Sequence, residues 1–233
     1  MRSRFAILSI LLVSILSCGQ PAATPRHDFS ALSFRPLGPG VDGTRIVIEP
    51  SRGVTPLIRL IDRAQKQIFV EAYILTHRRI IRALQRAEAQ GVGVYVLLDR
   101  QPFGMGPQPQ QLASTLSAAG VAVRWASPRF TYSHAKFLVI DDRTAVIATA
   151  NLSKAAYNSN REVLVIDQSP EDVRALSSLF RQDWDRLTGL NRDPNIVLSP
   201  RSSRDILSQL VLSARKSIDV YAEEVADSGM EHT

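Results

Sequence analysis

A histidine and a lysine stand two positions apart, His134 and Lys136, and are followed by Asp141, Asn151 and Glu162. If this stretch is a strand, residues two apart share one face, so the imidazole and the ammonium group lie together. Imidazole can attack phosphorus or shuttle a proton, and a fixed positive charge beside it stabilises phosphoryl oxygens. The cluster is therefore suited to phosphodiester chemistry, with Glu162 able to hold the second ring nitrogen of His134.

The alternative is that His134 and Lys136 are ordinary surface residues at a strand edge. The chain holds only 4 histidines, and chance alone gives the spacing His-x-Lys-x4-Asp with a probability of about 0.004. We therefore favour the catalytic interpretation. We expect neither metal nor cofactor, because the cluster lacks the carboxylates or imidazoles that a catalytic zinc or magnesium ion requires.

Alternating strand and helix patterns surround this cluster and must position it. Apolar residues recur at helical spacing between several strand-like segments, and Asp141-Asp142-Arg143 is predicted to form a tight hairpin. Alternation of this kind indicates an α/β fold built on a layered sheet. The predicted strands are Arg45–Glu49, Gln67–Leu75, Val92–Asp99, Val121–Trp125, Ala135–Ile140, Thr144–Thr149 and Arg161–Asp167.

Capping residues predict where the helices begin and end. Thr76 is expected to cap one helix, with His77 on an exposed face. Ser169 followed by Pro170 marks the start of another helix, which Gly189 is expected to close. A short helix is predicted over residues 110–119, after a loop that is rich in proline and glycine.

Four residues match, in register, the HKD signature of the phospholipase D superfamily, His-x-Lys-x4-Asp-x6-Gly-Ser-x-Asn: His134, Lys136, Asp141 and Asn151. Ala148 replaces the glycine, and Thr149 replaces the serine but keeps its hydroxyl. Asn160-Arg161-Glu162 resembles the family's Asn-x-Glu, and Glu71-Ala-Tyr73 is typical of the same fold. The resemblance covers Arg45–Asp193 and implies a layered α-β-α sandwich with a mixed central sheet.

The resemblance also implies a metal-independent mechanism. One histidine forms a phosphohistidine, a second histidine protonates the leaving oxygen, and water then releases the product. The implied catalytic residues are His134, Lys136, Asp141 and Glu162, and the implied phosphate-binding residues are Lys136, Thr149, Asn151 and Asn160. The chain holds a single motif, so a homodimer that brings two copies of His134 together is expected to complete the site.

The first residues have the pattern of an export signal. Arg2 and Arg4 precede an apolar and serine-rich run, Phe5–Leu16, which is too short for a comfortable membrane span. The run leads to Cys18, the chain's only cysteine, and Ile15-Leu16-Ser17-Cys18 resembles the lipobox of bacterial lipoproteins. This resemblance implies acylation of Cys18 and export to a membrane-anchored location, with plain secretion as the alternative.

Four segments are predicted along the chain: a signal peptide over 1–17, a flexible tether over 18–43, a phospholipase D-like domain over 44–193, and the start of a second repeat over 194–233. Ten residues between Ile46 and Ala72 recur identically 150 positions later, between Ile196 and Ala222. This constant offset predicts an internal duplication whose second copy stops just after its second strand.

Composition narrows the possible functions. Apolar residues at 45% and charged residues at 21% exclude a disordered chain, and the net charge of +6 favours phosphate-bearing partners. The leading hypothesis is a phospholipase D-type phosphodiesterase acting on phospholipid head groups. The loop Gln101–Gln111 would then be a rim for lipid chains, or simply a connector. The alternatives are a secreted homodimeric endonuclease, whose partner is nucleic acid, and an inactive fragment that binds anionic phosphate groups.

Overall fold

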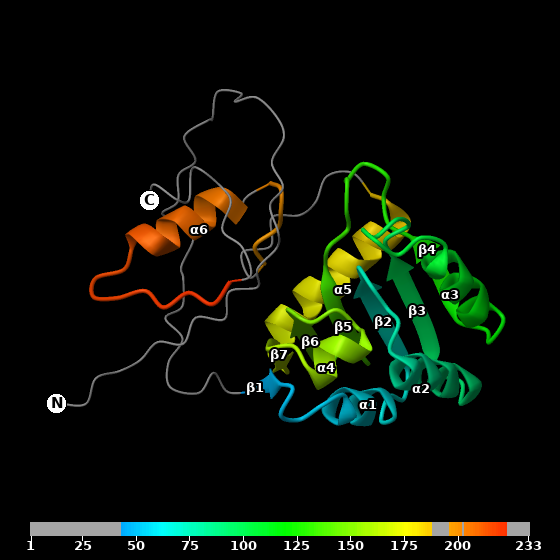
Figure 1. Ribbon diagram of the computed structural model, residues 1–233. Coiled ribbons are helices and arrows are strands. Elements are labelled where there is room, and N and C mark those ends of the chain that lie inside the picture. The colour runs from blue at the N-terminus through cyan, green and yellow to red at the C-terminus, as the bar shows by residue number, and fades with distance from the viewer. Residues whose placement is uncertain (1–42, 188–195, 202, 223–233) are drawn as a thin grey trace. The chain divides into compact units, whose positions relative to one another are not determined.

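The computed structural model describes residues 43–187, 196–201 and 203–222, which fall into two compact units. The first unit, residues 40–192, holds the sheet (Figure 1). Its strands are β1 (Thr44–Glu49), β2 (Gln67–Ala72), β3 (Gly93–Leu98), β4 (Ala122–Trp125), β5 (Lys136–Ile140), β6 (Thr144–Ala148) and β7 (Glu162–Asp167). Its helices are α1 (Thr55–Ile61), α2 (Arg78–Ala89), α3 (Gln108–Ser117), α4 (Lys154–Asn158) and α5 (Pro170–Asp185).

The strands form one sheet in the order β1-β7-β6-β5-β2-β3-β4. β2, β3 and β4 run parallel, and the other neighbours are antiparallel. This confirms the predicted α/β fold with a mixed central sheet. The tight hairpin is also confirmed, because Asp141 and Asp142 both have positive φ between β5 and β6.

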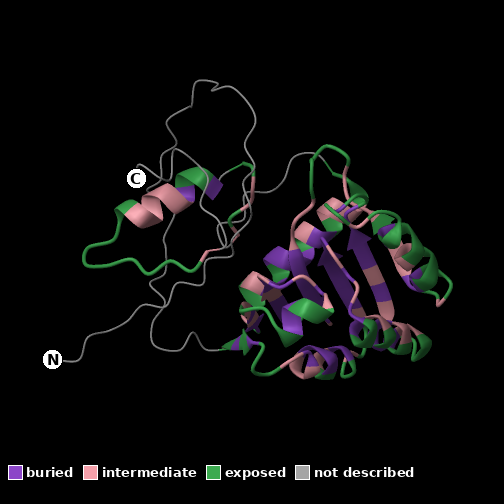
Figure 2. Cartoon of the chain, viewed as in Figure 1, coloured by how far each residue is buried: buried purple, intermediate pink, exposed green. Residues whose placement is uncertain are grey.

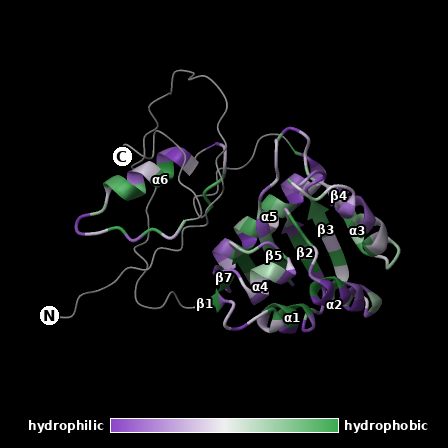
Figure 3. Cartoon of the chain, viewed as in Figure 1, coloured by the Kyte–Doolittle hydropathy of each residue, from purple (hydrophilic) through white to green (hydrophobic). Residues whose placement is uncertain are grey.

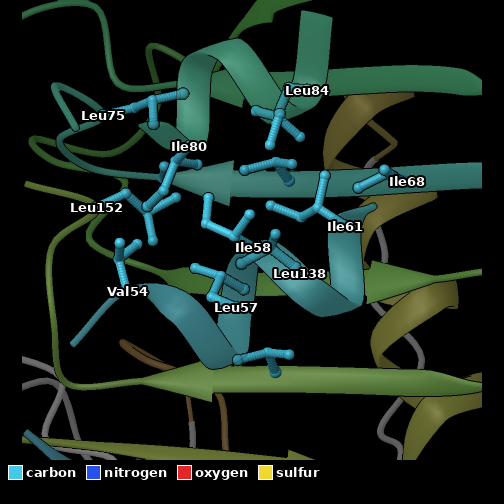
Figure 4. Close-up of a cluster of buried hydrophobic side chains, with 14 of the residues drawn as sticks. Val54, Leu57, Ile58, Ile61, Ile68, Leu75, Ile80, Leu84, Leu138 and Leu152 are labelled. Atoms are coloured by element: carbon cyan, nitrogen blue, oxygen red, sulfur yellow. The ribbon is translucent and has the colours of Figure 1, made fainter. Parts of the chain in front are cut away.

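Helices cover both faces of this sheet, and the alternation of side chains along β2 decides which residues each face receives. Ile68 and Val70 point into a cluster with residues of α1 and α2 (Figure 4). Phe69 points to the opposite face and stacks on Phe180 of α5, with ring centroids 4.6 Å apart. Full burial of one such side chain contributes about 1.5–3 kcal/mol, so the two faces together hold the layers in place. Figure 2 shows the sheet largely buried, and Figure 3 shows its strands as largely apolar.

One helix start differs from the sequence prediction. The N-cap of α2 is His77, not Thr76, and Nδ1 of its ring accepts a hydrogen bond from the Arg79 amide at 3.2 Å. His77 is buried, which corrects the expected exposed face, because its own amide donates to the Leu152 carbonyl and draws it inward. The start of α5 is confirmed, with the Ser169 hydroxyl as cap and proline at the first turn. Gly189 lies outside the described residues.

In the other unit, the described residues form one helix, α6 (Ser203–Leu212). Residues 213–222 contain no strand, although the predicted duplication places one there. A strand needs a neighbouring strand to bond its backbone, and the described part of this unit supplies none. Cys18 and the predicted signal peptide lie outside the described residues. Among the helices that are described, none has the length and apolar character needed to cross a bilayer.

Candidate active site

Six of the predicted site residues gather where several strands end: His134, Lys136, Thr149, Asn151, Asn160 and Glu162. Because β6 is antiparallel to β5, which is antiparallel to β2, the carboxyl ends of β2, β3, β4 and β6 share one edge with the amino ends of β5 and β7. We call this the site edge. His134 and Lys136 lie there at the start of β5, and Thr149 and Asn151 follow β6. Asn160 and Glu162 lie at the start of β7.

His134 and Lys136 contact each other directly. The ammonium Nζ of Lys136 lies 3.1 Å from Nδ1 and 3.2 Å from Nε2 of the imidazole, and it donates to the His134 carbonyl at 3.0 Å. Lys136 is only 6% exposed. The ring of Tyr73 packs edge-on against the imidazole at a centroid distance of 4.5 Å and lies 5.7 Å from Nζ. The ring of Tyr73 thus covers one side of the pair.

This environment keeps the imidazole neutral. Burial is the larger cause, and the charge of Lys136 the second, of a His134 pKa lowered to about 4. A neutral imidazole has a ring nitrogen lone pair free for attack, whereas a protonated one has none. At neutral pH, therefore, the imidazole of His134 carries the lone pair that nucleophilic attack requires, and it lies beside a buried positive charge.

Glu162 makes different contacts from those expected. Its Oε2 accepts a 2.6 Å hydrogen bond from the Thr149 hydroxyl, and the Asn160 amide donates to Oε1 at 3.4 Å. The hydroxyl oxygen of Thr149 in turn accepts from the Val163 amide at 3.0 Å. The carboxylate therefore fixes the segment after β6, whereas the sequence hypothesis placed it on the ring of His134. The structure brings Thr149, Asn160 and Glu162 into one hydrogen-bonded group.

Asn151 carries an available polar group at the same edge. Its side-chain oxygen is buried and has no hydrogen-bond partner among the described residues. A buried polar atom without a partner costs free energy, so such atoms mark positions that a ligand can satisfy. This oxygen can only accept a hydrogen bond, so it suits a donor and not a phosphate oxygen. The phosphate contact predicted for Asn151 would come from its side-chain NH2 group and stays a prediction.

Asp141 lies away from this group. It follows Ile140, which pairs with Ile68, whereas Lys136 pairs with Ala72 at the site edge. Its carboxylate accepts hydrogen bonds from the amides of residues 65, 66 and 67 at 2.7–3.2 Å. The structure thus gives Asp141 a structural role at the opposite edge, where it fixes the start of β2, and does not bring it to His134.

The structure adds residues that the sequence hypothesis did not assign to the site. The Ser133 hydroxyl donates to the Glu71 carboxyl at 2.9 Å, and the Ser133 amide donates to Asp99 at 2.7 Å. Burial, and secondarily the charge of Asp183, raises the pKa of Glu71 to about 8. These contacts anchor the residue next to His134. The sequence feature that could have pointed to these residues is Glu71, a glutamate inside an otherwise apolar strand.

The described residues contain no group of three or more His, Cys, Asp or Glu side chains that could hold a metal ion. The chemistry that the site edge itself supports is nucleophilic attack by a neutral imidazole, with an ammonium and an amide to bind the oxygens of the group attacked.

Known proteins are similar to this chain in sequence. Residues 57–184, more than half of the chain, match the family model described as "Cardiolipin synthase, PLD-like domain". A phospholipase D from Rickettsia conorii is 29% identical over 140 residues, which are 58% of this chain and 64% of the relative. A mitochondrial cardiolipin hydrolase from Danio rerio is 28% identical over 114 residues, 48% of each chain. A Listeria monocytogenes cardiolipin synthase is 27% identical over 131 residues, 54% of this chain and 26% of the relative.

Solved structures agree. The phospholipase D family member Nuc from Salmonella typhimurium superposes with a TM-score of 0.56 at 25% identity, covering 61% of this chain and 93% of Nuc. NucT from Helicobacter pylori shares the fold at 22% identity and a TM-score of 0.55, covering 63% of this chain and 98% of NucT. The chain spans less than two thirds of the length of the curated relatives above. From the match to the family model, together with the strand order and the edge that carries His134 and Lys136, it follows that this chain belongs to the phospholipase D-like family.

Proposed function

We propose that this protein is a phosphodiesterase of the phospholipase D type that acts on phospholipid head groups. The observation that carries the proposal is the neutral imidazole of His134 held against the ammonium of Lys136 at 3.1 Å. The names of the relatives, a phospholipase D, a cardiolipin hydrolase and a cardiolipin synthase, support a phospholipid as the substrate class.

The reaction follows from these groups. A ring nitrogen of His134 attacks phosphorus, the bond from phosphorus to the head-group oxygen breaks, and that oxygen takes a proton from a general acid. Lys136 and Asn151 bind the non-bridging oxygens, which gain charge in the transition state. Water, or an acceptor alcohol, then attacks phosphorus and breaks the phosphorus–nitrogen bond. Hydrolysis releases phosphatidic acid, and transfer releases a new phosphodiester.

The general acid is proposed to be His134 of a second copy. Among the described residues the other histidine is His77, whose ring caps α2. A two-fold axis would place the two copies of His134 on opposite sides of one phosphate. Mixing wild-type chains with His134→Ala chains tests this, because only dimers with two histidines turn over. An equal mixture should retain about a quarter of the activity if the site is shared and about half if each chain acts alone.

Head-group release from phosphatidylglycerol vesicles tests the function itself. Wild-type protein should release glycerol, and should form phosphatidylbutanol when butanol is added, because an enzyme-bound phosphatidyl group can pass to an alcohol. His134→Ala should abolish both products. The net charge of +6 also suits a nucleic-acid backbone, so nicking of plasmid DNA without lipid turnover would favour an endonuclease. Neither activity would indicate a chain that only binds phosphate groups.

Acylation of Cys18 is proposed from the sequence alone. Detergent phase partition of the mature protein tests it, since acyl chains move a protein into the detergent phase. A mature protein that stays in the aqueous phase with a free Cys18 thiol would contradict the proposal.

A further inference from the structure

We propose that two loops at the site edge form a surface that inserts into the interface of an anionic lipid bilayer. We call this surface the aromatic rim and define it as Phe103, Phe130 and Tyr132 with Arg100 and Arg129. The choice of a bilayer as occupant rests on the proposed function; the surface itself rests on the observations that follow.

The rim collects the exposed aromatic side chains of the first unit. Phe103 is 82% exposed, Phe130 39% and Tyr132 37%, and these are the most exposed aromatic residues among residues 43–187. All three lie in the segments that follow β3 and β4, at the site edge (Figure 1). Figure 2 shows the segment between β4 and β5, and its residues 128–132 are exposed. Single exposed apolar residues are common, but a cluster beside a reactive group marks an interaction site.

The first loop is built to present Phe103. The Asp99 carboxylate accepts from the Gln101 amide at 2.8 Å, and the Met105 amide donates to the Pro102 carbonyl at 3.2 Å, which closes a turn. Gly104 lies in that turn with φ of +74°, a conformation in which an L side chain is strained. Pro102 is buried while its neighbour Phe103 projects outward. The exposure of Phe103 is therefore fixed by an ordered turn.

Both loops are tied to each other and to the reactive histidine. Asp99 bonds the first loop through one oxygen and the Ser133 amide of the second loop through the other. The Tyr73 hydroxyl accepts from the Phe103 amide at 2.7 Å, while its ring contacts Tyr132 at 5.8 Å and His134 at 4.5 Å. The rim thus lies next to His134, where a head group would have to enter.

The charge around the rim suits an anionic surface. Between Asp99 and Asp141 the sequence has no acidic residue, and it has the exposed Arg100 and Arg129 beside the site edge. Each Lys or Arg close to an anionic membrane contributes about 1 kcal/mol of attraction. Aromatic side chains with arginines beside them are the composition of interfacial anchors, because rings enter the boundary region while charges stay at the head groups.

Vesicle sedimentation tests the rim without any need for turnover. All variants are full-length chains carrying His134→Ala, to stop turnover, and Cys18→Ser, to remove the predicted acylation site. Phe103→Ser with Phe130→Ser should weaken binding to phosphatidylglycerol vesicles by about tenfold or more, since each ring loses an apolar environment. Arg129→Gln should weaken it about fivefold, and only on anionic vesicles. Ile46→Ser is the matched control, because Ile46 is 41% exposed on β1 at the far end of the sheet order.

A second measurement locates the contact directly. A tryptophan placed by Phe103→Trp should be quenched by lipids brominated in the acyl chain, whereas one placed by Ile46→Trp should not. Binding that is unchanged by the two Phe substitutions, or equal quenching at both positions, would overturn the rim. The proposal would also be overturned if the two Phe substitutions weakened binding to a single-stranded oligonucleotide but left vesicle binding intact. The occupant of the rim would then be nucleic acid.

The outcomes for the rim and for the proposed function can be told apart. If vesicle binding depends on Phe103 but the parent protein with His134 releases no head group, the surface stands and the proposed function fails. If head-group release occurs but vesicle binding does not depend on the rim residues, the proposed function stands and the proposal of the rim fails. On a water-soluble phosphodiester, Phe103→Ser in a chain with His134 should turn over as the parent does, because its side chain lies outside the catalytic group.

Discussion

Replacing Asp141 should unfold the protein more readily without removing the chemistry of its site. The carboxylate accepts from three consecutive backbone amides at the start of β2. With each hydrogen bond contributing about 1 kcal/mol, Asp141→Ala loses about 3 kcal/mol of unfolding free energy. The φ of 57° at this position adds about 1 kcal/mol for alanine, but little for asparagine. Asp141→Asn keeps one acceptor oxygen, so it should lose only about 1–2 kcal/mol.

Urea unfolding followed by tryptophan fluorescence measures these losses, with turnover of a soluble phosphodiester per folded molecule measured in parallel. Activity of Asp141→Asn should stay within about twofold of wild type, since Asp141 makes no contact with the reactive group. Asp62→Asn is the matched control: its exposed ion pair with Arg86 should contribute less than about 1 kcal/mol. The reasoning is refuted if Asp141→Asn unfolds like wild type yet loses its activity.

Three further predictions concern protons and metals. The pKa of Glu71 is raised to about 8 in the folded state. The contribution of Glu71 to stability is therefore complete below the unfolded pKa near 4.5 and is lost as the pH rises toward 8. The loss is up to about 1.4 kcal/mol per pH unit. Glu71→Gln should flatten this fall in urea titrations between pH 5 and 8. The His134 pKa is about 4. For a soluble phosphodiester whose leaving group needs no protonation, such as a 4-nitrophenyl ester, kcat/KM should therefore stay level from pH 7 to 5 and fall only near pH 4, where the nucleophile becomes protonated. A decline centred on pH 6.5 would show that the ring is not desolvated. Activity should survive EDTA, and a loss that a divalent ion restores would contradict nucleophilic attack by His134 without a metal.

The elements were predictable where local patterns decide them. β5 and the hairpin after it follow from the apolar run Phe137–Ile140 and two aspartates suited to positive φ. The second strand was predicted to run through Leu75 but ends at Ala72. Apolar pattern alone cannot show this end, because Leu75 remains buried and makes an isolated bridge to Leu152, a residue 77 positions away in the sequence.

The site was predictable to the extent that strand alternation controls it. The contact of His134 with Lys136 is the one that their spacing predicted, although β5 begins only at Lys136 and His134 lies just before it. The contacts of Ser133 do not follow from spacing, because Glu71 and Asp99 lie 62 and 34 residues away along the chain. Asp141 shows the opposite case: it belongs to the motif by spacing, yet five strand residues place it at the other edge of the sheet. The spacing of a motif shows which residues occur together in the sequence, but the length and direction of the strand between them determine where each residue lies.

The pairing of β1 with β7 has a consequence for how the chain folds. Thr44 pairs with Asp167, so the first strand stays without its neighbour until more than a hundred further residues are available. β2, β3 and β4 are joined by short helical crossovers and can associate early, whereas closing a long loop carries a larger entropic cost and slows folding. During synthesis, residues 67–125 are therefore expected to associate while β1 is still free. The pairing of β1 with β7 completes the sheet last. The segment around Glu162, at the start of β7 on the site edge, is then fixed at the same time.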